Sequence, residues 1–374
     1  MTIPYGRQWI DDADIAAVSA ALRSDWLTTG PAVAEFERAV AAAAGTPCSV
    51  AVSSGTAALH AAYAAAGIGA GDVVVTTPLT FVATAATAAQ LGARIEFADV
   101  EPDTGNLDPD AAAAALAPGT RVVAAVDYAG HPVRADELAQ IAHGAGALLL
   151  EDAAHSIGST LDGRPVGSLA DITTFSFFPT KNLTTAEGGA VVAADPALIA
   201  RAERYRTHGL VRERSEQRYP DEGPWHQEVH AFGLNYRLPD VLAALGTSQL
   251  RRLEMFKARR TAIFERYGAE LADLGVTLPA RHGNADPMWH LYPLRVPAED
   301  RRRIFEELRA RGILVQVNYI PVYWHPVFED LGYRRGLCPV AEQYYREEIS
   351  LPMFASLTDD DQSRVIDAVR EVIA

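Results

Sequence analysis

The sequence predicts an α/β protein with a large domain built on a mostly parallel sheet and a smaller C-terminal α+β domain. Between about residues 49 and 194, short apolar runs alternate with longer segments of helical pattern, which is typical of parallel strands joined by helices. After residue 275 the order is strand, helix, strand and a closing amphipathic helix. With 374 residues, of which 49% are hydrophobic, the chain is long enough for two domains.

Seven apolar runs account for the sheet of the large domain. Each is short and ends at polar or turn-forming residues. The predicted strands are CSVAVSS at 48–54, DVVVTTP at 72–78, ARIEFADV at 93–100, RVVAAVDY at 121–128, ALLLEDA at 147–153, DITTFSFF at 171–178 and GGAVVAA at 188–194. Helical patterns occupy some of the intervals between them, at 56–67, 81–92 and 135–146.

Two longer segments follow the sheet. Residues 201–237 are charged and aromatic with little periodicity, so we expect a long irregular loop near the site. A helical pattern at 241–271 predicts a connecting helix with a break near Gly246.

The small domain is predicted from its own alternation of patterns. Its elements are a strand at 290–296, a helix at 302–312, a strand at 313–320 and the closing helix. The predicted division of the chain is an N-terminal arm at 1–12, the large domain at 13–245, and the connecting helix with the small domain at 246–374.

Composition excludes several classes of function. The formal net charge is −15, and acidic residues are spread along the chain, which argues against a nucleic-acid partner. The two cysteines, Cys48 and Cys338, and the lack of a secretory leader pattern predict a cytoplasmic location. No apolar run reaches the roughly 18 to 20 residues of a membrane span. The histidines show no HExxH spacing, so we expect no catalytic metal.

The stretch SSGTAALHAA at 53–62 predicts an anion site. In a parallel sheet, ligands bind at the carboxyl ends of the strands. Gly55 and Thr56 open a helix directly after a strand, where backbone N–H groups and the helix dipole favour an anion such as phosphate. An ordinary N-cap by Ser or Thr would also account for this motif alone.

Two further motifs place charged groups at strand ends. ALLLEDAAHSIGS ends a buried strand at Asp152, where a carboxylate requires a cationic partner; a helix N-cap or a structural ion pair would also explain it. TFSFFPTKN places Ser176 at a strand end and Lys181 in the next turn. A partly desolvated lysine has a lowered pKa and can form a Schiff base, although most lysines are only solvated surface groups.

Taken together, the three motifs predict a cofactor. An anion hole, a carboxylate for a pyridinium nitrogen and an amine for an aldehyde are what pyridoxal 5'-phosphate requires. Their occurrence in one sheet, in this order, favours that cofactor over three unrelated structural features.

The motifs resemble those of the DegT-type sugar aminotransferase family over nearly the whole chain. The stretches that carry the resemblance are TTPLTFVATA at 76–85, VDYAGHPV at 126–133, NLTTAEGGAVV at 182–192, RARGILVQVNYIPVY at 309–323 and EEISLP at 347–352. The resemblance implies the fold-type I architecture of pyridoxal-phosphate-dependent transferases and a homodimer with shared active sites.

The resemblance also implies roles for residues around the cofactor. Lys181 matches the Schiff-base lysine, and Asp152 matches the partner of the pyridinium nitrogen. Phe81 matches the aromatic residue that stacks on the cofactor ring, unless it is a core aromatic, and His155 lies where the family has a His or Gln near the phenolic oxygen. The residues that match phosphate ligands are Ser176, Gly55 and Thr56.

Further residues are implied to contact the phosphate or the substrate. Asn235 resembles the asparagine that reaches the phosphate of the neighbouring subunit. Arg237 is a candidate for a substrate phosphate or carboxylate, or else a solvated arginine. Tyr5, Tyr319 and His325 lie where related enzymes contact the nucleotide sugar.

The implied reaction is the transfer of an amino group from L-glutamate to a nucleotide-linked 4-keto-6-deoxy sugar, UDP-2-acetamido-2,6-dideoxy-hexos-4-ulose. The alternatives are a dTDP-linked or C3-keto sugar, a sugar dehydratase, and a non-catalytic regulator that binds the cofactor. In the dehydratase branch a histidine replaces the Schiff-base lysine, so Lys181 argues against it. A regulator would be favoured by loss of Lys181 or Asp152, and both are present.

Overall fold

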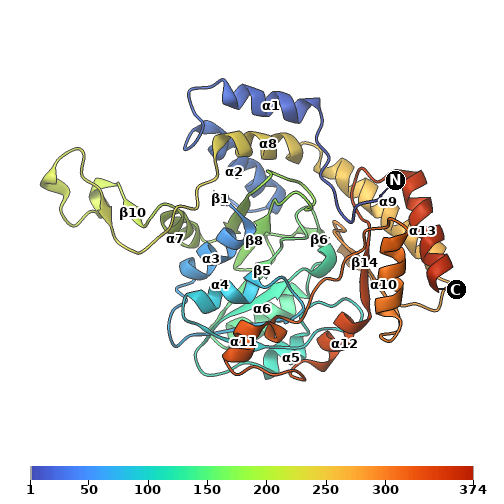
Figure 1. The fold of residues 1–374 in the computed structure, drawn as a ribbon. Coiled ribbons are helices and arrows are strands. Elements are labelled where there is room, and N and C mark those ends of the chain that lie inside the picture. Colours follow the sequence, from blue (N-terminus) through green and yellow to red (C-terminus); the bar gives the residue numbers. More distant parts are fainter. Residues whose placement is uncertain (1, 374) are drawn as a thin grey trace.

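The computed structural model describes residues 2–373 and has a seven-stranded sheet at its centre (Figure 1). Along the sheet the strand order is β1-β9-β8-β5-β4-β2-β3. The strands are β1 (Cys48–Val52), β2 (Val73–Thr76), β3 (Arg94–Phe97), β4 (Thr120–Val126), β5 (Leu148–Asp152), β8 (Ile172–Ser176) and β9 (Gly189–Ala193). Each lies within, or within one residue of, one of the seven apolar runs predicted to form strands.

The sheet is mostly parallel, as predicted. Five neighbouring strands, from β3 to β8, pair in parallel, and β9 runs antiparallel to both β8 and β1. Only β9 is therefore reversed. The carboxyl ends of β1, β5 and β8 consequently lie at one edge of the sheet, where the three predicted motifs begin.

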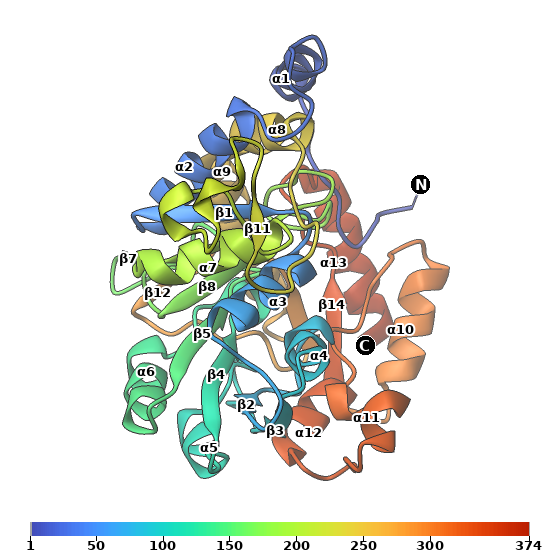
Figure 2. The same ribbon diagram turned by 90° about the vertical axis from the view of Figure 1, so that its left-hand side faces the viewer.

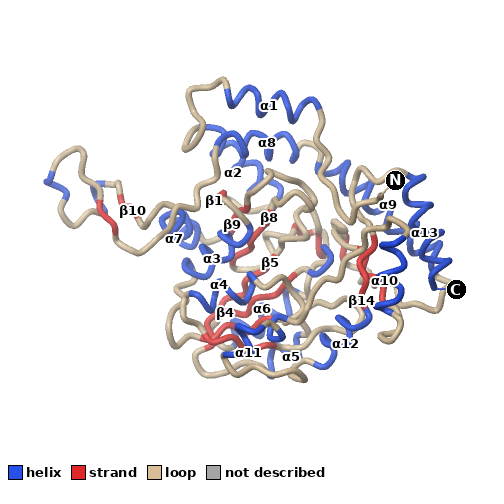
Figure 3. The backbone as a smooth tube through the Cα atoms, in the orientation of Figure 1, coloured by secondary structure: helices blue, strands red, loops and turns tan. Residues whose placement is uncertain are grey.

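Helices cover both faces of the sheet, as Figures 2 and 3 show. Val74 and Val75 are neighbours on β2 but belong to different hydrophobic clusters, because side chains alternate across a strand. The cluster of Val74 includes residues of α3, α4 and α7, which cover one face of the sheet. The cluster of Val75 includes residues of α2, α5 and α6, which cover the other face. These helices are α2 (Pro31–Ala44), α3 (Gly55–Ala65), α4 (Ala83–Gln90), α5 (Pro109–Ala114), α6 (Ala135–Gly144) and α7 (Pro196–Arg206).

The C-terminal part has a third hydrophobic cluster. Two antiparallel strands, β13 (Tyr292–Arg295) and β14 (Glu348–Leu351), pack with helices that include the closing helix. Its core includes Ile263, Trp289 and Val365, and Ile3 of the N-terminal arm joins it. The remaining helices are α1 (Asp12–Leu22), α8 (Asp240–Leu250), α9 (Leu253–Leu271), α10 (Arg301–Ala310), α11 (Pro326–Asp330), α12 (Pro339–Glu347) and α13 (Asp359–Ile373).

The predicted strand at 313–320 is wrong as a regular strand. The backbone hydrogen bonds of this segment are divided between the N-terminal arm and β14. Ile313 forms a bridge with Ile3, and Gln316 forms a bridge with Ser350. The N–H of Asn318 binds the carboxylate of Glu348 instead of a backbone carbonyl. A continuous ladder therefore does not form along it.

The predicted helix break near Gly246 is also wrong. Gly246 lies inside α8, where a Cβ would come within 2.4 Å of a Phe36 ring carbon and 2.7 Å of Thr185 Cγ2. Glycine is needed there for close packing, and the helix is interrupted at Arg251 and Arg252 instead. The predicted domain boundary at 245/246 falls within α8, so the division into domains stays a prediction.

The irregular segment begins later than predicted, because α7 continues to Arg206. Residues 207–235 then leave the body of the molecule as an extended hairpin with two short strands, β10 (Leu210–Val211) and β11 (Glu228–Val229) (Figure 1). Strands this short leave no apolar run in the sequence. The same holds for the small sheet of β6 (Thr160–Leu161), β7 (Arg164–Pro165) and β12 (Ala285–Asp286).

None of the helices within residues 2–373 is both long and apolar enough to cross a membrane.

Candidate active site

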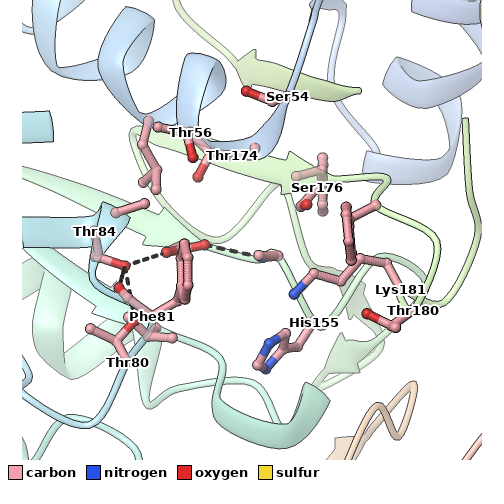
Figure 4. A pocket seen from close by; sticks show the side chains of 18 of the residues that line it. Ser54, Thr56, Thr80, Phe81, Thr84, His155, Thr174, Ser176, Thr180 and Lys181 are labelled. Carbon is pink, nitrogen blue, oxygen red and sulfur yellow. Dashed lines mark hydrogen bonds between the residues drawn. The ribbon is translucent and has the colours of Figure 1, made fainter. Parts of the chain in front are cut away.

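A cavity of about 440 Å³ lies at the carboxyl ends of the sheet strands. Its walls come from the start of α3, the loop before α4, the end of β5, and the end of β8 with the turn that follows (Figure 4). The predicted site residues that line it are Gly55, Thr56, Phe81, Asp152, His155, Ser176, Lys181 and Tyr319. Segments more than 250 residues apart in the chain therefore meet here.

The start of α3 provides free backbone donors. The Ser54 side chain caps the helix by accepting from the N–H of Ala57 at 3.0 Å. The N–H groups of Gly55 and Thr56 have no hydrogen-bond partner among the described residues. A Cβ on Gly55 would lie 2.7 Å from Ser176 Cβ, so only glycine allows the two segments to approach this closely. Both the N-cap and the anion site are thus compatible with the motif.

Asp152 is the last residue of β5 and is buried. Its Oδ2 accepts from the Thr84 hydroxyl at 2.7 Å, and its Oδ1 accepts from the N–H of Ala154 at 3.2 Å. Burial raises the pKa of this carboxyl, whereas the two hydrogen bonds and the charge of Lys181 lower it. No ion pair forms on Asp152 within residues 2–373. A cationic ligand group in the cavity would relieve the cost of burying this carboxylate.

Lys181 stands in the turn after β8. Its backbone N–H donates to the carbonyl of Phe178 at 2.9 Å, and Thr184 and Thr185 both bond back to the carbonyl of Phe177. Burial lowers the pKa of Lys181 to about 8, against the charge of Asp152, which raises it. With that pKa, about a tenth of the amine is unprotonated at pH 7, far more than for an ordinary lysine, and the unprotonated form is the nucleophile.

Two buried polar atoms in the cavity wall have no hydrogen-bond partner within residues 2–373. They are Nδ1 of His155 and Oγ1 of Thr174. The other ring nitrogen of His155, Nε2, lies 3.1 Å from the hydroxyl of Tyr319. Burial holds the pKa of His155 well below its usual range, so the ring is neutral. Unpartnered buried groups are rare in native proteins and indicate a ligand at this place.

Phe81 is not a core aromatic, because its side chain is 58% exposed. The ring stands at the cavity and packs edge-on against Tyr319 at a centroid distance of 6.3 Å. An exposed aromatic face at a cavity wall is suited to stacking on a flat ligand ring.

Four predicted site residues do not line the cavity. Tyr5 accepts a hydrogen bond from the side chain of Asn318, which precedes Tyr319. Asn235 and Arg237 lie where the hairpin returns to the body, and Arg237 bridges the last residue of β1. His325 immediately precedes the short helix α11. The side chains of Asn235 and Arg237 make no hydrogen bond or ion pair with other described residues.

A sequence profile identifies the family. The profile of the DegT/DnrJ/EryC1/StrS aminotransferase family matches residues 8–370. The chain belongs to this family. It is a pyridoxal-phosphate-dependent sugar aminotransferase, which sets aside the non-catalytic alternative.

Named relatives cover the whole length of this aminotransferase. The spore coat polysaccharide biosynthesis protein SpsC of Bacillus subtilis is 38% identical over 99% of this chain and 97% of its own. The UDP-4-amino-4,6-dideoxy-N-acetyl-beta-L-altrosamine transaminase of Campylobacter jejuni is 36% identical over 99% of this chain and 97% of its own. The putative sugar aminotransferase Spr1654 of Streptococcus pneumoniae, solved in its PLP form, superimposes with a TM-score of 0.93 at 30% identity, covering 100% of this chain and 99% of its own.

The residues of this aminotransferase fit pyridoxal phosphate. The free N–H groups of Gly55 and Thr56 suit the phosphate, the buried carboxylate of Asp152 suits the pyridinium nitrogen, and Lys181 suits the aldehyde. The unpartnered Nδ1 of His155 offers a polar contact to the ring substituents. When bound, the cofactor supplies an aldehyde that takes up amino groups and a ring that delocalises negative charge.

Sequence reasoning missed several residues of the site. Thr84 binds the carboxylate of Asp152, and it follows Phe81 by three residues in the same TFVATA motif. Thr174 lies directly opposite Asp152 in the pairing of β5 with β8, which the strand predictions could have indicated. Asn182 and His290 were also missed. Both are buried, and neither lines the cavity.

One group of potential metal ligands occurs among the described residues, outside this cavity. It comprises Glu101, Asp103 and His282. The absence of a catalytic metal remains a prediction.

Proposed function

We propose that this aminotransferase converts the 4-keto group of UDP-2-acetamido-2,6-dideoxy-hexos-4-ulose to an amine, with L-glutamate as donor. The observation that carries the proposal is that Asp152, at the end of β5, and Lys181, in the turn after the adjacent strand β8, line the same cavity. The altrosamine transaminase of C. jejuni supports the choice of a UDP-linked 4-amino-4,6-dideoxy sugar.

In this proposal Lys181 acts twice. Lys181 would hold the cofactor through its aldehyde until the amine of glutamate takes its place. The Nζ of the freed Lys181 would then accept the proton from the donor Cα, and its pKa of about 8 allows it to give that proton up again. The ammonium and amine forms are both accessible near neutral pH, so one residue can serve as base and acid.

The other proposed roles keep the cofactor oriented. Asp152, held by Thr84 and Ala154, keeps the pyridinium nitrogen protonated. Ser176 joins the start of α3 at the phosphate, and Phe81 stacks on the ring. Tyr319, whose hydroxyl lies beside His155, is proposed to contact the sugar. Tyr5 and His325 are proposed to contact the sugar as well.

We further propose a homodimer in which Asn235, and with it Arg237, completes the site of the other subunit. Two observations support this. Both side chains lack partners among the described residues, although the backbone of Arg237 is bridged to Val52 of β1 and that of Asn235 to Thr207. The hairpin carries large apolar side chains into solvent, with Trp225 at 80% exposure and Phe232 at 98%, which is typical of a surface covered by another chain.

The function is tested by turnover of defined substrates. The purified protein is incubated with L-glutamate and a panel of UDP- and dTDP-linked sugars that carry the keto group at C4 or at C3. We expect the largest kcat/KM for the UDP-linked 4-keto sugar, with 2-oxoglutarate formed in equal amount. A larger kcat/KM for a dTDP-linked or C3-keto sugar would replace the proposed substrate. Absence of 2-oxoglutarate with glutamate alone, under single-turnover conditions, would remove glutamate as donor.

A further inference from the structure

Asn182, the residue after Lys181, uses the whole of its side chain in hydrogen bonds. It is 4% exposed. Its Nδ2 donates to the carbonyl of His155 at 2.6 Å and to the carbonyl of Met288 at 3.0 Å. Its Oδ1 lies 3.2 Å from Nδ1 of His290, and because an amide oxygen only accepts, Nδ1 of His290 carries the proton.

His290 is a buried neighbour of His155. Its ring packs on the ring of His155 with a centroid distance of 4.3 Å and an angle of 36° between the planes. Its backbone N–H is fixed by the carbonyl of Ala129 at 2.8 Å. His290 is 4% exposed and follows β12 in the connection to the C-terminal strands. This connection therefore packs a buried ring against His155, although His290 itself does not line the cavity.

Asn182 thereby joins the turn of Lys181 to the turn of His155 in two ways. One link is direct, from its amide to the His155 carbonyl, and the other runs through the His290 ring, which packs at a tilt on the ring of His155. The backbone of Lys181 itself is fixed by a single hydrogen bond to Phe178. A side chain on a turn needs such support, since a misplacement of about 1 Å can cost roughly 100-fold in rate.

We propose that Asn182 and His290 are positioning residues that hold Lys181 and His155 at a fixed separation. The inference rests on the proposed role of Lys181 and adds a support that neither the motifs nor the cavity lining includes. Neither residue touches the reacting atoms, so each acts through Lys181 or His155.

The test compares Asn182→Ala with a matched control. Asn106 is 1% exposed, and its side chain likewise donates to two carbonyls, those of His131 and Pro132, and accepts from the N–H of Tyr128. It does not line the cavity. Asn106→Ala therefore removes an equivalent set of buried hydrogen bonds without touching the turn of Lys181.

The readout is the rate at which added pyridoxal phosphate becomes attached to Lys181 in cofactor-free protein. The bond is fixed by borohydride at successive times, and the Lys181 peptide is quantified by mass spectrometry. We expect Asn182→Ala to slow attachment by about 100-fold and Asn106→Ala to change it by less than about twofold. Equal effects of the two substitutions would overturn the proposal.

A second pair of variants decides the matter if Asn182→Ala does not fold. His290→Asn retains an amide N–H that can bond to Asn182, whereas His290→Ala retains neither the donor nor the ring. We expect attachment to be slowed at least about tenfold more in His290→Ala than in His290→Asn, the equivalent of one hydrogen bond at roughly 1.4 kcal/mol. Identical rates for the two would contradict the proposal.

A double-variant experiment separates positioning from general destabilisation. In a Lys181→Ala background, Asn182→Ala has only His155 left to position, so we expect it to weaken the binding of pyridoxal phosphate less than it does in the unchanged protein. An equal or larger loss would show a direct role in binding and overturn the proposal. If borohydride fixes the cofactor to another lysine in the unchanged protein, the proposed role of Lys181 is wrong, and that result refutes the proposed function and not the positioning role of Asn182.

Discussion

Lys181 combines two opposing influences within one residue. Burial disfavours its ammonium form and the nearby Asp152 carboxylate favours it, with the result that the pKa is about 8. The turn that carries it depends on backbone and threonine hydrogen bonds and not on packing of the lysine. Its chemistry and the stability of its surroundings are therefore separable.

We predict that Lys181→Ala lowers kcat by about 10³-fold or more and leaves the protein folded. Lys181→Arg should be equally inactive, because a guanidinium stays protonated and does not form an imine. Initial rates measure the activity, and circular dichroism with thermal unfolding measures the fold. Retained turnover in either variant would rule out Lys181 as the nucleophile.

The charge of Asp152 leads to a prediction about pH. A neighbouring carboxylate stabilises the ammonium form of Lys181, so removing it in Asp152→Asn should lower the pKa of Lys181 below about 8. In cofactor-free protein, the rate of labelling of Lys181 by an amine reagent should rise with pH to a midpoint near that pKa. We expect the midpoint of Asp152→Asn to lie at lower pH.

The same variant should bind pyridoxal phosphate more weakly. Loss of a charge-assisted hydrogen bond costs roughly 1.5 to 3 kcal/mol, which is about tenfold or more in affinity. The thermal unfolding midpoint should change little, since burial already disfavours the charged form of Asp152. An unchanged labelling midpoint together with unchanged affinity would place Asp152 outside the cofactor site.

Much of the site could be predicted from single residues, because strand ends in a parallel sheet meet at one edge. Gly55, Asp152 and Lys181 follow strands that the apolar runs mark clearly, and the three do line one cavity. His290 could not be found in this way. It reaches the site through a connection whose course depends on the packing of the C-terminal part, which no local pattern encodes.

At the scale of elements, α8 shows how tertiary packing overrides local propensity. Glycine weakens a helix and so predicted a break, yet α8 continues through Gly246 because Phe36 and Thr185 occupy the space of a side chain. Six of the seven sheet strands contain at least four buried residues, which made them predictable, whereas in β3 only Ile95 is buried. The two-residue strands depend on pairing alone and have no such pattern.

We predict opposite effects of glycine substitution in two neighbouring helices. Gly246→Ala gains about 1 kcal/mol of helix propensity but introduces contacts near 2.4 Å, so the net effect should be a destabilisation of roughly 1 to 2 kcal/mol. In α9, a Cβ added at Gly268 would meet no other atom within 4 Å, so Gly268→Ala should stabilise by about 0.5 to 1 kcal/mol. Urea unfolding measures both, and equal signs would contradict the packing argument.

At the scale of the whole molecule, the hairpin and the body present different surfaces. The sheet buries its apolar residues on both faces, whereas the hairpin exposes Trp225 and Phe232. Asn235 stands at the base of this hairpin, where it bridges Thr207, and Arg237 two residues later bridges Val52 of β1, the strand that leads into the proposed phosphate site. The proposed dimer would cover the hairpin and bring Asn235 to a second cavity.

We predict that two defective variants complement each other when mixed. A Lys181→Ala subunit still supplies Asn235, and an Asn235→Ala subunit still supplies Lys181. With random exchange of subunits, half of the dimers are mixed and each has one intact site, which gives about a quarter of wild-type activity. Native mass spectrometry verifies the exchange. If mixed dimers form without any gain in activity, Asn235 does not act across the interface.

The N-terminal arm has a consequence for how the protein is made. Ile3 pairs with Ile313, and the carbonyl of Tyr5 accepts from the N–H of Met353, so these hydrogen bonds of the arm are made with residues more than 300 positions later in the chain. At a synthesis rate of about 5 to 20 residues per second, the arm emerges from the ribosome some 20 to 70 s before its partners exist. The arm therefore stays undocked through most of the synthesis of residues 1–353, and the surface that holds Tyr5 beside the site is assembled late.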